Sequence, residues 1–130
     1  MPIQCIATQG TMKREHCQKL VVYVNPENPT EPGNEADNQD QAVAIYLRPN
    51  CGGDVRRAID EQKKETDGKR SMANLANRVV DIDPMPLDPT GQPWQKITDT
   101  NMETLPEWVI MAILNAMTGQ AKNEAENEKN

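Results

Sequence analysis

The stretch VVDIDPMPLDPTGQPWQKITDTNMETLPEWVIMAILNAM, from Val79 to Met117, decides the fold that we expect for this chain. It contains both tryptophans of the chain, its clearest turn signal and its most apolar helical pattern. We therefore expect the remaining elements to be organised around this stretch.

A tight turn is expected at Asp88-Pro89-Thr90-Gly91. The Asp88 side chain can bind the backbone two residues on, Pro89 presets φ, and Gly91 accepts a positive φ. Extended arms should flank the turn, but Pro84, Pro86 and Pro93 lack the amide donor that a central strand needs. The pattern therefore predicts an irregular hairpin, or a loop lying over a helix.

A helix over Leu105–Thr118 should follow the turn. Both Thr100–Glu103 and Thr104–Glu107 fit a capping box, and we prefer Thr104 as the cap because Pro106 then falls in the first turn. Gly119 is a suitable residue just beyond its end.

This helix is apolar on more than one face, because Ile110, Met111 and Leu114 lie off the stripe that contains Trp108 and Ile113. Such a helix is either enclosed at the centre of the core or covered by a partner. The chain has no phenylalanine to enclose it, which favours a partner. The candidate partner-binding residues are Trp94, Leu105, Trp108, Ile110, Met111, Leu114 and Met117.

Upstream of this stretch, Lys19–Asn25 and Gln41–Arg48 have the composition of strands and should pair antiparallel. The Pro-rich, acidic segment 26–40 between them should be a mobile loop. Helices are expected after Asp54 and after Ser71. The prediction is a small α+β fold: an antiparallel sheet or hairpin of two to three strands with about three helices, the C-terminal one central. We expect one domain over 1–118 and a polar, disordered tail over 119–130.

The net charge of -6 and the pI of about 4.8 disfavour binding to nucleic acid and to anionic membranes, which needs clustered basic residues. The first ten residues lack the basic and apolar runs of a secretory signal, and no stretch is long enough to span a membrane. These patterns predict a soluble cytoplasmic protein.

No catalytic or metal motif stands out. Cys5, Cys17 and Cys51 with His16 are four possible ligands, but their spacing matches no zinc module, so we expect reduced thiols and no metal. Asp81 and Asp83 alternate with Ile82 and could face one side of an extended segment, although exposure or local turn bonding is the simpler interpretation. We expect neither an enzyme nor a bound cofactor.

The segment LANRVVDIDPMPLDPTGQPWQKITDTNMETLPEWVIMAILNAM, together with Ala44–Pro49 (AIYLRP), resembles the tail assembly chaperones of long-tailed bacteriophages. The resemblance covers about Gln41 to Met117. It rests on an acidic extended segment, a DxxG turn, a Thr-rich helix start and an LPxWVxxAI-like helix. These features are a loose pattern rather than a set of catalytic residues.

The resemblance implies a non-enzymatic assembly factor that acts in the host cytoplasm. Such a factor coats the tape measure protein, helps to recruit tail tube subunits and can form homo-oligomers. The alternative that we keep open is a structural virion protein, such as a tail completion or head–tail connector subunit. Its copies would assemble into a ring, and segment 26–40 would become ordered on assembly.

Overall fold

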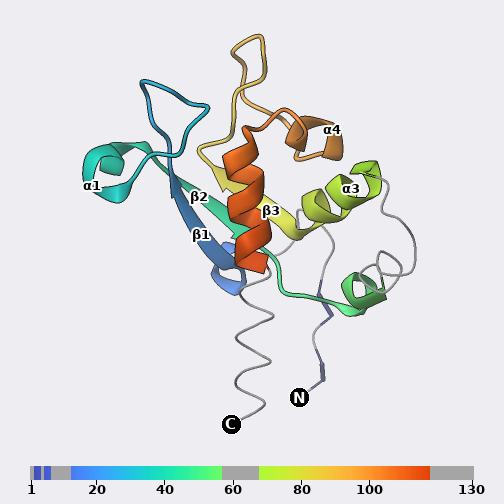
Figure 1. Cartoon of the computed structure of the whole chain (residues 1–130). Helices are drawn as coiled ribbons and strands as arrows, with labels where there is room; N and C mark the ends of the chain where they lie inside the picture. Colours follow the sequence, from blue (N-terminus) through green and yellow to red (C-terminus); the bar gives the residue numbers. More distant parts are fainter. Residues whose placement is uncertain (1, 4, 7–12, 57–67, 118–130) are drawn as a thin grey trace. The chain divides into compact units, whose positions relative to one another are not determined.

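The computed structural model describes residues 2–3, 5–6, 13–56 and 68–117, and it has the α+β fold that the sequence predicts (Figure 1). Three strands form one antiparallel sheet in the order β1-β2-β3. The strands are β1 (Gln18–Tyr23), β2 (Ala42–Leu47) and β3 (Val79–Asp83). The helices are η1 (Arg14–His16), α1 (Glu35–Asn38), η2 (Gln39–Gln41), α3 (Gly68–Arg78) and α4 (Asp99–Met102), with further helical turns at 52–56 and 107–117.

The chain divides into two compact units. The first unit consists of Met1–Lys19 and Ala44–Thr104, and the second of Leu20–Val43 and Leu105–Asn130. Most of the buried apolar side chains belong to the first unit: Ile45, Leu47, Leu75, Ala76, Val79, Ile82, Trp94, Ile97 and Met102. In the described part of the second unit, only Val22 and Ile113 are buried to the same degree.

The register between β2 and β3 explains how an irregular strand still fills the core. Ile45 lies opposite Ile82, but Leu47 lies opposite Val79, so the pairing skips Val80. An extra residue of this kind reverses the alternation of a strand. As a result both Ile82 and Val79 are buried, although they are three residues apart.

The predicted turn is confirmed. Asp88 Oδ1 accepts hydrogen bonds from the amides of Thr90 (2.9 Å) and Gln92 (3.0 Å), and a bridge between Leu87 and Pro93 closes the loop. Gly91 has a φ of 88°, a conformation that costs other residues energy. The hydroxyl of Thr90 and the backbone donors of the turn lower the pKa of the Asp88 carboxyl.

The predicted start of the C-terminal helix is wrong. Thr104 is not its cap, because the Thr104 hydroxyl and amide both bind the carbonyl of Asn101, at 2.7 and 3.0 Å, at the end of α4. Thr98 is the capping residue of the preceding helix α4. Its side-chain hydroxyl accepts a hydrogen bond from the amide of Asn101. The last helix begins at residue 107, with Pro106 accepting its first backbone bond. Its central position in the fold remains a prediction.

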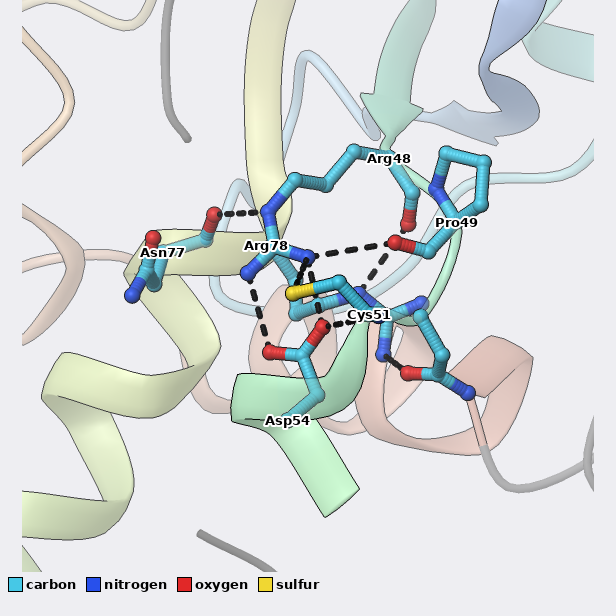
Figure 2. A network of polar contacts seen from close by, with 7 residues as sticks. Arg48, Pro49, Cys51, Asp54, Asn77 and Arg78 are labelled. Atoms are coloured by element: carbon cyan, nitrogen blue, oxygen red, sulfur yellow. Dashed lines mark hydrogen bonds and ion pairs between the residues drawn. The ribbon is translucent and has the colours of Figure 1, made fainter. Parts of the chain in front are cut away.

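A buried arginine joins three segments of the first unit, and sequence reasoning missed it (Figure 2). The Arg48 side chain has no exposed surface and forms a two-pronged ion pair with Asp54, with Nη2 to Oδ1 at 2.9 Å. Its other donors bind the carbonyls of Asn77 (2.9 Å) and Pro49 (3.1 Å). One side chain therefore links the end of β2, the turn that leads into 52–56 and the last turn of α3.

A second buried arginine completes this network. Arg78 donates through Nε to the carbonyl of Arg48 (3.0 Å), and it also binds the side chain of Asn50. The backbone amide of Arg48 in turn donates to the carbonyl of Arg78 (2.9 Å). Burial lowers the pKa of Arg78, whereas the hydrogen bond to Asp54 raises that of Arg48.

Replacement of Asp54 by alanine should lower the free energy of unfolding by about 3 kcal/mol, because it leaves the buried Arg48 charge without its carboxylate. Chemical denaturation measures the change. Val55→Ala is the matched control in the same helical turn, since that side chain is 57% exposed and its loss should cost less than about 0.5 kcal/mol. Equal effects of the two substitutions would contradict a stabilising role for the pair.

Replacement of Gly91 by alanine should cost about 1 kcal/mol, since the residue keeps a positive φ although an added Cβ meets no atom within 4 Å. Gly52 is the control, because its Cβ position is equally open and its φ is ordinary. Gly52→Ala should be neutral or stabilising in the same unfolding assay. A neutral Gly91→Ala would show that the turn relaxes without strain.

Candidate functional site

The strongest candidate site in the described residues is a groove of about 600 Å³ in the second unit. One wall is the strand segment Val21, Val22 and Tyr23, and Thr30, Pro32 and Gly33 of the following loop also line the groove. The other wall is one stripe of the helix 107–117, formed by Glu107, Trp108, Met111, Ala112 and Asn115. The groove has the size of a ligand-binding cleft.

Beside the groove, the same helix exposes apolar side chains. Met111 is 46% and Leu114 is 40% exposed, and Ile110 is partly exposed, whereas Ile113 is fully buried. We call Ile110, Met111 and Leu114 the client face. The helix therefore buries one face and leaves this second apolar face accessible to a partner.

Trp108 ties the long loop to the helix. Its indole Nε1–H donates to the carbonyl of Pro29 at 3.0 Å, across 79 positions of sequence. The loop is also shaped locally: Asn28 accepts bonds from Thr30, and Asn34 caps α1 by accepting the amide of Asp37 (2.9 Å). The expected mobility of 26–40 remains a prediction, but the segment has turns and short helices that its composition did not indicate.

The described part of the second unit is acidic, and Glu107 lines the groove. The described part of the second unit, 20–43 and 105–117, contains no Lys, Arg or His. Its acidic residues are Glu27, Glu31, Glu35, Asp37, Asp40 and Glu107. Because no base neutralises them within the same segments, the composition of this unit favours cationic ligands.

The other residues proposed for partner binding have different surroundings. Trp94 belongs to the first unit and is 6% exposed, so it offers almost no surface to a partner and we remove it from the binding surface. Leu105 and Met117 are partly exposed at the two ends of the helical region. Trp108 lines the groove, but its polar edge is already used by the loop.

The pair Asp81 and Asp83 does lie on one side of β3, where both carboxylates bind Arg14. The Arg14 Nε donates to Asp81 Oδ2 (2.6 Å) and its Nη1 to Asp83 Oδ2 (3.2 Å), and the guanidinium also lies 4.9 Å from the ring centre of Tyr46. The hydrogen bond to Asp81 raises the pKa of Arg14. Both carboxylates are thus paired with the guanidinium of Arg14.

The cysteines are free: Cys5 is exposed, and Cys17 and Cys51 are partly buried. Burial raises the pKa of the Cys17 thiol. The described residues contain no group of three or more His, Cys, Asp or Glu side chains that could hold a metal ion. Within the same residues, none of the helices has both the length and the apolar character needed to cross a bilayer.

Comparisons with protein-family models, with curated proteins and with solved structures found no match to this chain.

Replacement of Trp108 by phenylalanine should free the loop 26–40 while leaving most of the apolar contact in place. The lost hydrogen bond corresponds to about 1 kcal/mol, so amides near Pro29 should exchange several-fold faster. Hydrogen exchange measured by mass spectrometry tests this. Tyr46→Phe in the first unit is a control that should not alter exchange in the loop, and unchanged exchange in Trp108→Phe would contradict the anchoring role.

Proposed function

We propose that this chain is a tail assembly chaperone of a long-tailed bacteriophage, which binds an apolar helical client through the client face. The client would be the tape measure protein, and the chaperone would help to recruit tail tube subunits in the host cytoplasm. The proposed role is one of binding and requires no enzymatic activity and no cofactor.

The observation that carries this proposal is the exposure of Met111 and Leu114 on a helix in which the neighbouring Ile113 is fully buried. Helices commonly recognise helical partners through such a row of apolar residues one turn apart. Complete burial of a leucine or methionine side chain contributes about 1.5–3 kcal/mol, so covering the partly exposed Met111 and Leu114 would supply part of the binding free energy.

The charge of the second unit also supports a chaperone role. A client rich in apolar helix aggregates when it is free, and a bound acidic unit would keep the complex soluble by repulsion between copies. The same charge would favour clients that carry basic residues beside their apolar positions.

Leu114→Asp should weaken client binding at least about tenfold, since it places a charge in the proposed apolar contact. The measurement is a pull-down from infected or co-expressing cells, with mass spectrometry of the proteins that co-purify. A very long helical protein should be the main partner of the unmodified chain and should be lost with Leu114→Asp.

Two further variants make this experiment decisive. Val55→Asp introduces the same charge at an exposed apolar position of the first unit, and it should retain the client. Ile113→Asp charges the fully buried position and should unfold the helix, which circular dichroism would record. If Leu114→Asp loses helicity like Ile113→Asp, the client face is part of the core. Recovery of virion ring components alone would favour the structural-subunit alternative.

A further inference from the structure

We propose that the groove of the second unit binds an extended, basic segment of a partner by pairing with the outer edge of β1. The segment would add a strand to the sheet and place Lys or Arg side chains beside the acidic residues of the unit. This inference goes beyond the proposed function, although Met111 belongs both to the groove and to the client face.

The first argument is the set of residues on the strand wall. Val21, Val22 and Tyr23 all line the groove, although successive side chains of a strand point to opposite faces. A groove that contacts three consecutive residues reaches the backbone between them, as a groove along the edge of a strand does. In the sheet order β1-β2-β3, β1 is an outer strand.

The second argument is the direction of the backbone groups. The amide of Val24 donates to the carbonyl of Gln41 on the β2 side, whereas the carbonyl of Tyr23 accepts from Gly33 on the opposite side. Because backbone groups alternate between the two edges, the amide and carbonyl of Val21 point away from β2. Among the described residues, the sheet places no strand on that side of Val21, which is 39% exposed.

The third argument identifies the occupant. Edge strands commonly bind extended peptides, with backbone bonds supplying affinity and side-chain contacts supplying specificity. Here Trp108 and Met111 offer apolar contact, and Glu107 lines the groove. The described part of the unit has six acidic and no basic side chains, which selects a cationic segment. A second copy of the chain would bring the same acidic unit against itself, so repulsion disfavours it as the occupant.

A pair of seven-residue peptides tests the proposal, one alternating lysine with valine and the other glutamate with valine. Fluorescence anisotropy with the full chain should give binding of the lysine peptide at least about tenfold tighter than that of the glutamate peptide, and this difference should shrink as salt is added. N-methylation of the backbone amides on the peptide edge that would pair with β1 should weaken binding at least about tenfold, since it removes the pairing donors.

Two protein measurements locate the site. The amide of Val21 should exchange more slowly when the lysine peptide is bound. Glu107→Gln should weaken peptide binding several-fold, whereas the same change at Glu103, an exposed residue of the first unit, should leave it unchanged. Val55→Asp, which adds a charge in the first unit, should also leave it unchanged.

Equal affinity for the methylated peptide, equal affinity for the glutamate peptide, or unchanged exchange at Val21 would each overturn the proposal. Self-association of the chain through β1 that excludes the lysine peptide would also overturn it. Failure of the client pull-down with intact peptide binding would instead count against the proposed function alone.

Discussion

The first unit depends on the burial of one charge. A guanidinium removed from water must have nearly all of its donors satisfied, because an unpaired buried charge costs several kcal/mol. Arg48 meets this requirement with partners on the turn that follows β2 and on the last turn of α3. Since α3 runs into β3 without an intervening loop, fixing the end of the helix also fixes where β3 begins beside β2. The core residues of β2 and β3 are therefore placed by a polar network where β2 ends and β3 begins.

The second unit has a smaller apolar core among its described residues. Its described residues contribute few buried apolar side chains, and its loop is attached to the helix by the indole of Trp108. A partner that binds only the folded state would add directly to the stability of such a unit. The same unit carries the exposed apolar residues of the client face, the outer edge of β1 and a surplus of acidic groups. Three features that favour binding thus occur together in the unit whose described residues include fewer buried apolar side chains.

Elements with a local cause were predictable. The turn at 88–91 follows from Asp88, Thr90 and Gly91, whose interactions span only a few residues. Both β-branched segments form strands close to the expected limits. The start of the last helix was not predictable, because Thr98, Thr100 and Thr104 all provide a capping hydroxyl. Capping preferences do not distinguish between these threonines. In the structure Thr98 caps α4, and Thr104 lies just after the end of α4.

The sequence by itself determined the α+β class, the turn chemistry, the acidic charge and an apolar helix with two faces. The tertiary structure alone decided that Arg48 and Arg78 are buried, that Trp94 lies in the core, and that Trp108 binds a loop far away in sequence. It also brought Glu107 and Met111 into one groove with Val21, Val22 and Tyr23 of β1. The reason is physical: propensities and caps depend on neighbours within one helical turn, whereas burial and side-chain pairing depend on which distant segments meet. The periodicity of the sequence does not indicate which of these distant segments come into contact.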